Sequence, residues 1–335
     1  MTRLGFGRTS LEPDQSWRRK VTISQLNYVV AVDKYRNFVE AARHCFVTQP
    51  TLSMQIKKLE ETLDVVIFDR SKQPVVPTVL GEKLIGQARI VLREAARLEE
   101  IINEERGQIK GNYRLGIIPT LASTVLPLFL REFSKEYPDV KLIIQELQTR
   151  VMEEMLEEDT LDGGIAVTPL ENRKIVEHPL FYEPFYLFVS TNHPLASSRK
   201  VMETELANQE VWLLNEGHCF RNQVIKLCRM QGGADRSPSV RFESGNLQTL
   251  IRLVEQDFGM TLLPYLLIRE FERPEQKNMV RPFTPPVPIR EVSLIHRRQV
   301  VKKNITEALI SAIRKTLPPE LSQKTTKDHH LLNPF

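Results

Sequence analysis

Two of the three cysteines in this chain of 335 residues lie in a segment that could carry out redox chemistry. Cys219 follows an expected strand and stands at the expected start of a helix, with His218 and Arg221 beside it. A helix N-terminus and nearby cations lower the pKa of a thiol, and an accessible thiolate is oxidised to a sulfenic acid. A sulfenic acid condenses with a second thiol, and Cys228 stands nine positions further on.

The spacing of these cysteines has a structural consequence. If both share one helix, nine residues separate them by about 13 Å, whereas a disulfide requires Cα atoms within about 7 Å. Oxidation would then remodel residues 219–228 and could act as a switch. The same spacing also fits two buried structural cysteines, because a free cysteine is commonly a small hydrophobe. The residues alone leave both interpretations open.

Other residues offer less chemistry. Cys45 lies among apolar residues and is expected to pack in a core. The seven histidines are scattered, and none has zinc-ligand spacing with a cysteine. The glycine pairs at 163–164 and 232–233 indicate turns, not a phosphate-binding loop. The sequence therefore predicts neither a metal nor a cofactor.

The elements upstream predict a small DNA-binding head. Ser24, Asn37 and Thr48 can each cap a helix, and Pro50 is tolerated in the first turn of the third helix. Short strands at 66–68 and 75–76 complete a winged helix-turn-helix. The third helix has apolar residues at helical spacing, which are Leu52, Ile56, Leu59 and Leu63.

This third helix would present hydrogen-bonding side chains to base edges, while lysines and arginines reach phosphates. The same pattern also fits an ordinary solvated helix, and two isolated wing cations are commonly surface charges. The candidate DNA contacts are Thr48, Gln49, Pro50, Thr51, Ser53, Gln55, Lys57 and Lys58 on the helix, with Arg70 and Lys72 in the wing.

Residues 79–107 predict a long helix that pairs with a second copy of the chain. From residue 112, strands alternate with helices, which favours mainly parallel sheets in two lobes with a cleft between them. The expected elements there include strands at 185–190, 211–214, 239–242 and 291–296 and a helix at 220–231. The apolar seam of the long helix is Leu84, Ala88, Val91, Ala95, Leu98 and Ile102.

Both ends of the chain look irregular. Residues 1–20 are polar and are expected to form a disordered extension, with Val21 as an alternative start. Residues 318–335 contain Pro318 and Pro319 and are expected to form a flexible tail.

Composition excludes several classes of protein. No run of about 18 apolar residues could span a membrane, and no secretory signal is present. Three cysteines fit a reducing cytoplasm better than a secreted disulfide scaffold. The net charge of +4 is entirely within residues 1–110, and residues 1–20 alone carry +3 of it. The prediction of DNA binding therefore rests on the positions of the lysine and arginine side chains in the head and not on the net charge of the chain.

The run AARHCFVTQPTLSMQIKKLE at residues 41–60 resembles the signature of LysR-type transcriptional regulators, and FDR at 68–70 and TVLG at 78–81 match it further. The resemblance implies an α/β protein that forms homotetramers on a double-stranded DNA operator. It implies a winged head at 21–80, a dimerising linker helix at 81–110 and a two-lobed effector domain at 111–317, similar to periplasmic binding proteins. Lobe I would comprise 111–184 and 288–317, and lobe II 185–287.

Within this family, GHCFR at 217–221 together with Cys228, FGMTLLP at 258–264, GIIPT at 116–120 and ELQT at 146–149 resemble the hydrogen-peroxide-sensing members. This resemblance implies an activator of oxidative-stress genes that works with RNA polymerase and is reset by a thiol reductant such as a glutaredoxin or thioredoxin. It implies a peroxidatic Cys219, a resolving Cys228, and a peroxide pocket of Thr120, Thr149, His218 and Arg221.

Two residues depart from that pattern, because Asn222 stands where an acidic residue is expected and Phe220 where a leucine is expected. Two other functions also deserve weight. One is a regulator that binds a small metabolite between the lobes, which the cysteine arrangement disfavours. The other is a thiol peroxidase, which the DNA-binding head and the dimer helix disfavour.

Overall fold

The computed structural model describes residues 21–207, 209, 211–228, 244–299, 302–321 and 325–335. The predicted extension at 1–20 and the predicted strand at 239–242 lie outside the described residues. The chain divides into two compact units, the first ending at Glu99 and the second beginning at Glu100. In the parts of the chain that are described, no helix is both long enough and apolar enough to cross a membrane.

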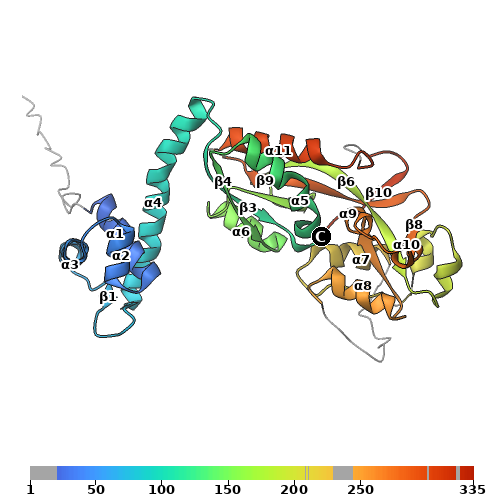
Figure 1. Cartoon of the computed structure of the whole chain (residues 1–335), viewed down its shortest axis with the longest axis horizontal. Coiled ribbons are helices and arrows are strands. Elements are labelled where there is room, and N and C mark those ends of the chain that lie inside the picture. Colours follow the sequence, from blue (N-terminus) through green and yellow to red (C-terminus); the bar gives the residue numbers. More distant parts are fainter. Residues whose placement is uncertain (1–20, 208, 210, 229–243, 300–301, 322–324) are drawn as a thin grey trace, which may run out of the picture. The chain divides into compact units, whose positions relative to one another are not determined.

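The first unit is the predicted winged helix-turn-helix (Figure 1). Asn37 and Thr48 cap their helices as expected. The first cap is Thr22 and not Ser24, because the Thr22 hydroxyl accepts from the Gln25 amide and the Gln25 side chain accepts from the Thr22 amide. The elements are α1 (Ile23–Tyr35), α2 (Phe38–His44), α3 (Gln49–Leu63), β1 (Phe68–Asp69), β2 (Val76–Pro77) and the start of α4 (Val79–Glu105).

The first turns of the long helix α4 pack against the core of the head, and the rest of the helix carries the exposed part of the predicted seam. Leu84 and Ala88 were expected in the seam, but Leu84 packs against the head core and Ala88 is buried. Further along, Val91, Leu98 and Ile102 are exposed, with Leu98 65% accessible. The exposed part of the predicted seam therefore begins later than the sequence pattern indicated, because the first turns of the helix complete the core of the head.

Gly81 is where α4 meets the wing, and Gly81→Ala is expected to destabilise the head. A Cβ at this position would lie 2.1 Å from the Ile67 carbonyl oxygen, which belongs to the backbone and cannot swing aside. Overpacking of this kind costs about 1–3 kcal/mol. The free energy of unfolding of the full chain, measured by urea denaturation, should fall by that amount.

Gly86 on the same helix provides a matched control, because a Cβ there would meet nothing within 4 Å. Gly86→Ala is expected to stabilise the helix by up to about 1 kcal/mol. Equal effects of the two substitutions would contradict the close approach at Gly81.

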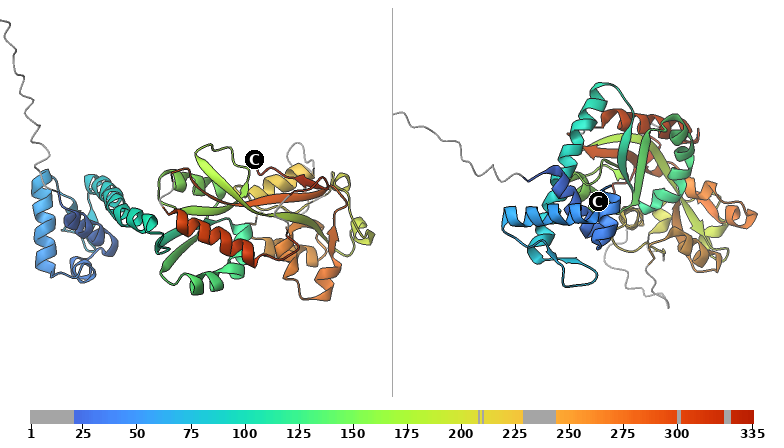
Figure 2. Two further views of the ribbon diagram at one scale, coloured as in Figure 1. Left: turned by 90° about the horizontal axis from the view of Figure 1, so that it is seen from above. Right: turned by 60° about the vertical axis from the view of Figure 1, so that its left-hand side comes forward.

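The second unit is built on one eight-stranded sheet (Figure 1). Its elements are β3 (Gly111–Ile117), α5 (Pro119–Glu136), β4 (Val140–Glu146), α6 (Thr149–Glu157), β5 (Gly163–Thr168), β6 (Ile175–Val189), η2 (Pro194–Ser197), η3 (Glu203–Leu206), α7 (Cys219–Leu227), α8 (Leu247–Glu255), β7 (Met260–Pro264), α9 (Tyr265–Arg269), α10 (Pro274–Asn278), β8 (Val280–Pro282), β9 (Val287–Arg297), α11 (Lys303–Thr316) and β10 (His329–Leu331). Figure 2 shows α11 lying along this sheet.

The expectation of mainly parallel sheets is wrong. Among the strands that the structure describes in this unit, β3 with β4, β3 with β5 and β9 with β10 pair in parallel, whereas β9 pairs antiparallel with β5 and β6, and β6 with β7 and β8. The long strands β6 and β9 lie side by side and antiparallel over much of this unit (Figure 1). The predicted strand at 211–214 is reduced to single bridges, Val211 to Met260 and Leu214 to Ser244.

This sheet supports two separate hydrophobic cores, and β6 passes from one to the other. Phe181 belongs to the first core, which we call core I, and Phe185 to the second, which we call core II. Core I is covered by α5, α6 and α11, and core II by α7 and α8.

The expectation of a flexible tail at 318–335 is wrong for the residues that the structure describes. His329–Leu331 forms β10 on the edge of β9. Leu321 is buried in core I and Leu332 in core II. Pro318 and Pro319 follow the end of α11. The apolar residues beyond them bury enough surface in the two cores to hold the segment in place.

Candidate functional site

The two candidate redox cysteines lie at opposite ends of α7. Cys219 is the first residue of the helix, with His218 as its N-cap, and Cys228 is the C-cap. Both thiols are free and buried, with Cys219 7% exposed and Cys228 0% exposed. Cys219 packs in core I and Cys228 in core II. A bond between the two sulfur atoms therefore requires both side chains to leave their packing and the helix between them to open.

The surroundings of the two thiols differ. Burial raises the pKa of Cys219, while the positive charge of Arg290, a hydrogen bond from Thr149 and the backbone amides of Phe220 and Cys219 act in the opposite direction. Burial alone raises the pKa of Cys228 to about 12. Cys219 is thus the thiol whose anion the site favours. The expectation of an accessible thiol of low pKa is wrong for this conformation, because the N-terminus of α7 is packed against core I.

Arg290 is the functional residue that the sequence reasoning missed. It lies on β9 with no exposed side-chain surface, and its guanidinium makes two hydrogen bonds to Glu183 Oε2, of 2.9 and 2.7 Å. The guanidinium also donates to the Thr120 hydroxyl at 3.1 Å and lies 5.4 Å from the ring centre of Phe220. An arginine inside the apolar run of β9 was the available signal, because a buried arginine requires a partner.

Two threonines of the predicted pocket lie at helix N-termini beside this charge. Thr120 is in the first turn of α5 and Thr149 is the first residue of α6, and both are buried. Apart from the Cys219 thiol, the Thr149 hydroxyl oxygen has no hydrogen-bond partner among the described protein groups. Helix N-termini favour a small polar ligand with negative character.

His218 and Arg221 were expected to add to the positive charge beside Cys219, and for His218 that expectation is wrong. Burial lowers the pKa of His218, opposed by the charge of Glu146, so its imidazole is neutral near pH 7. Arg221 donates to the Leu214 carbonyl at 3.1 Å. The buried Arg290 supplies the charge, and it comes from a strand 71 positions along the chain from Cys219.

The direction of the Cys219 pKa shift predicts how peroxide oxidation depends on pH. Because the thiolate reacts and the pKa lies above the ordinary thiol value, the thiolate fraction should rise about tenfold per pH unit through neutrality. The second-order rate constant for thiol loss, followed by stopped flow between about pH 6 and pH 8.5, should rise accordingly. A rate that levels off below neutral pH would contradict the raised pKa.

The head presents most of the predicted DNA contacts at its surface. Three of the candidates on α3 are half-buried, namely Thr51, Ser53 and Gln55. The Gln55 side-chain oxygen accepts a hydrogen bond from the Gln25 side chain at 3.3 Å. Lys57 lies 3.8 Å from Glu61, an exposed pair of little energetic weight. The exposed candidates on α3 and at its cap are Thr48, Gln49, Pro50, Lys57 and Lys58.

The two wing cations differ in their surroundings. Arg70 forms an ion pair with Glu60 at 2.9 Å and lies over the Phe38 ring. Glu60 also accepts from the backbone amides of Ile67 and Phe68. Arg70 therefore fastens the wing to α3, whereas Lys72 is 65% exposed and 3.8 Å from Asp69.

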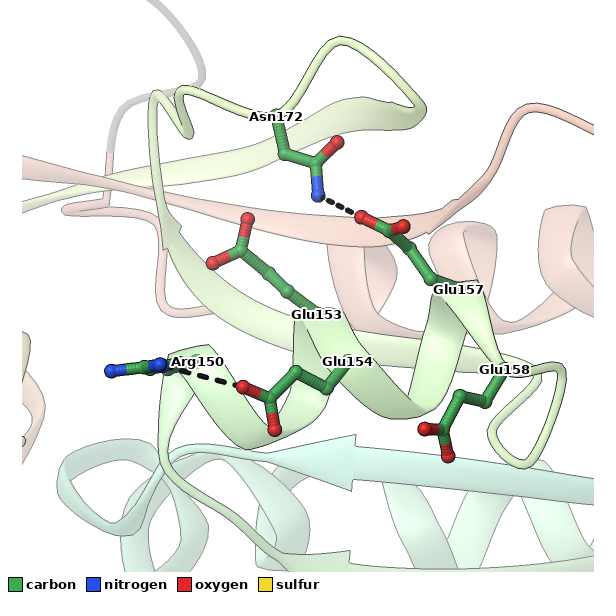
Figure 3. Close-up of a pocket in the computed structure, with 6 residues that line it drawn as sticks. All are labelled: Arg150, Glu153, Glu154, Glu157, Glu158 and Asn172. Atoms are coloured by element: carbon green, nitrogen blue, oxygen red, sulfur yellow. Dashed lines mark hydrogen bonds and ion pairs between the residues drawn. The ribbon is translucent and has the colours of Figure 1, made fainter.

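A polar pocket lies along α6, the helix that begins at Thr149 (Figure 3). Four of its six lining residues are glutamates, and two of these are bonded, Glu154 to Arg150 at 3.3 Å and Glu157 to Asn172 at 2.8 Å. Within the described ranges, no group of three or more His, Cys, Asp or Glu side chains is arranged to hold a metal ion. This pocket is a solvated acidic face of the helix.

A winged helix-turn-helix followed by a long helix and a two-core effector unit defines a transcriptional regulator with a sensing domain. Residues 23–82 match the bacterial regulatory helix-turn-helix family of the lysR type, and residues 106–318 match the LysR substrate binding domain. The chain belongs to the LysR family of transcriptional regulators.

Several relatives of this chain are designated as regulators of hydrogen-peroxide-inducible genes. The chain is 35% identical over 294 residues to the hydrogen peroxide-inducible genes activator of Haemophilus influenzae, covering 88% of this chain and 96% of that protein. It is 34% identical, over 88% of this chain and 95% of the relative, to the DNA-binding transcriptional dual regulator OxyR of Escherichia coli.

Solved structures agree with this placement. A cysteine-to-aspartate variant of full-length OxyR from Pseudomonas aeruginosa matches with a TM-score of 0.66 and 31% identity, covering 89% of this chain and 99% of that one. A hydrogen-peroxide-bound cysteine-to-serine mutant of Corynebacterium glutamicum OxyR matches with a TM-score of 0.61 and 27% identity, covering 89% and 92%.

Proposed function

We propose that this protein is a DNA-binding transcriptional regulator of oxidative-stress genes, mainly an activator, which hydrogen peroxide switches by joining Cys219 to Cys228. The observation that carries the proposal is the pair of unlike thiols at the ends of α7, of which only Cys219 has Arg290 and Thr149 beside it. Relatives named as hydrogen peroxide-inducible activators, and a peroxide-bound structure among the matches, support it.

The chemistry proceeds in two balanced steps. The Cys219 thiolate attacks one peroxide oxygen, so that an S–O bond forms, the O–O bond breaks, and hydroxide takes up a proton and leaves as water. The Cys228 thiolate then attacks the Cys219 sulfur, so that an S–S bond forms and the S–O bond breaks, releasing a second water. Two electrons pass from the two thiols to one peroxide.

The site residues have separate roles in this proposal. Arg290 stabilises the Cys219 thiolate through its charge, and Thr149 offers a hydroxyl to the thiolate or to the peroxide. Thr120 is held by Arg290 at the N-terminus of α5, where it can accept or donate to the peroxide. His218 acts as a neutral hydrogen-bonding group, and Arg221 holds the loop before α7 through the Leu214 carbonyl.

The signal passes from the site to DNA through the assembly of the chain. The exposed apolar residues of α4, among them Val91, Leu98 and Ile102, form the proposed dimer contact, and dimers join as a homotetramer on an extended operator. The residues of α3 contact bases and phosphates, and the DNA-bound protein contacts RNA polymerase. The protein works in the cytoplasm, where a glutaredoxin or thioredoxin reduces the disulfide.

A footprint on the chain's own upstream DNA, reduced and after peroxide treatment, tests this function. The expected result is protected DNA in both states with a different protected length after oxidation. Protection that peroxide leaves unchanged, but that a cell extract of small metabolites alters, would favour a metabolite-binding regulator and would refute the redox switch.

A further inference from the structure

The C-terminal segment lies directly on the helix that joins the two redox cysteines. The Asn222 side chain donates to the Pro334 carbonyl at 3.3 Å, and the Gln223 side chain donates to the Leu332 carbonyl at 2.7 Å. Both donors are in the middle of α7, between Cys219 and Cys228. We call residues 329–335 the C-terminal strap.

The same strap is bonded to the strand that carries the buried cation. His329–Leu331 pairs with Val287–Ile289 of β9, and the Leu332 amide donates to the Ile289 carbonyl at 2.9 Å. Arg290 is the next residue of that strand. The strap thus ties the thiol-bearing helix to the strand whose guanidinium favours the Cys219 thiolate.

The strap also packs into the core beneath α7. Leu332 is 4% exposed and belongs to core II together with Cys228. Gln223 has no exposed surface, and its side-chain oxygen has no hydrogen-bond partner among the described residues. The Leu332 carbonyl accepts from the buried side-chain amide nitrogen of Gln223, and leaving that nitrogen without a partner would cost about 1–3 kcal/mol.

Asn222 suits this arrangement because its side chain is a donor. A carboxylate at this position could not donate to the Pro334 carbonyl. The strap lies beyond residue 318, where the match to the LysR substrate binding domain ends.

We propose that the C-terminal strap holds α7 in its helical dithiol form and is released when Cys219 and Cys228 bond, so that it sets how much oxidant the switch requires. This inference rests on the proposed function. The physical reason is linkage: contacts made only by the dithiol form stabilise that form and oppose disulfide formation. A weakened strap should therefore shift the equilibrium toward the disulfide.

The test compares variants of the full chain in glutathione redox buffers, measuring the equilibrium constant between dithiol and disulfide. Asn222→Leu removes the donor and should raise the constant about fivefold, as expected for one hydrogen bond. A chain ending at Asn333 removes the acceptor together with the buried Pro334 and places the new carboxylate on an exposed residue, so it should raise the constant at least as much. The double variant should equal the truncated chain, because that chain has already lost the Asn222 contact.

Lys226→Gln is the matched control, since Lys226 is exposed on the same helix, and its constant should stay within about twofold of the wild type. A second measurement is hydrogen exchange of the strap amides, whose protection should be lost when the wild-type chain is oxidised.

The outcomes separate the two proposals. If peroxide forms no bond between Cys219 and Cys228, the proposed function fails and the strap with it. If the bond forms but the strap stays protected and the variants keep the wild-type constant, the strap is overturned and the proposed function stands. If the effects of the two single changes on the constant add up in the double variant, Asn222 and Pro334 do not act through one shared contact, and the strap proposal is overturned.

Discussion

Cys219→Ser is expected to abolish the loss of thiols that one equivalent of peroxide causes in the wild-type chain. The wild type should lose two thiols per chain, from Cys219 and Cys228. The variant should lose neither, because Cys228 is fully buried and burial raises its pKa to about 12. The measurement is thiol titration with and without peroxide, together with mass spectrometry of the peptides.

Cys228→Ser is the matched variant and should behave differently. Its Cys219 is still oxidised, but the sulfenic acid has no partner at the end of α7, so it should persist or be oxidised further. Trapping with a sulfenic-acid reagent should label Cys219 in this variant alone. An unchanged disulfide yield in Cys228→Ser would refute the resolving role of that residue and point to Cys45, which packs against the core of the head.

Arg290→Met is expected to lower both the stability of the chain and the reactivity of Cys219. The Glu183 carboxylate, which also accepts from the Leu266 amide, would be left buried without its cation. Removal of one partner of a buried ion pair costs about 3–5 kcal/mol. Loss of the positive charge should also raise the Cys219 pKa further, and one pKa unit lowers the rate of oxidation about tenfold at neutral pH.

A double substitution separates these two effects. Arg290→Met with Glu183→Gln removes both charges and should recover much of the lost free energy of unfolding. The rate of peroxide oxidation should remain low, because no cation faces Cys219. Recovery of the rate along with stability would show that Arg290 has only a structural role.

An exposed ion pair provides the control for the stability measurement. Lys174 and Glu157 are 2.6 Å apart, as close as the Arg290–Glu183 pair, but both are on the surface. Lys174→Met should change the free energy of unfolding by less than about 1 kcal/mol, because solvent screens the pair.

Local features of the chain were predictable from the sequence. The caps at Asn37 and Thr48, the apolar spacing of α3 and the helix that begins at Cys219 depend on neighbouring residues, and the structure has all of them. The family could also be identified from short runs such as residues 41–60, because family-specific residues there are contiguous.

The antiparallel pairing of β6 with β9 was not predictable in the same way. Each strand extends beyond the segment whose pattern indicated a strand, and pairing between residues more than one hundred positions apart leaves no local periodicity. The ordered structure of the C-terminal segment, which contains two prolines and a polar run, could not be predicted for the same reason. Its stability comes from cores I and II, which the distant residues Leu321 and Leu332 enter.

The sequence by itself indicated which atoms are candidates for redox chemistry: two thiols nine positions apart, too far apart to bond if they share one helix. The tertiary structure decided the surroundings of these thiols. It buried Cys219, left His218 neutral and brought Arg290 from a distant strand to supply the charge. It also laid residues 329–335 across the helix. The physical reason is that desolvation and Coulomb energy depend on what lies near an atom in space, which the spacing of residues along a chain does not specify.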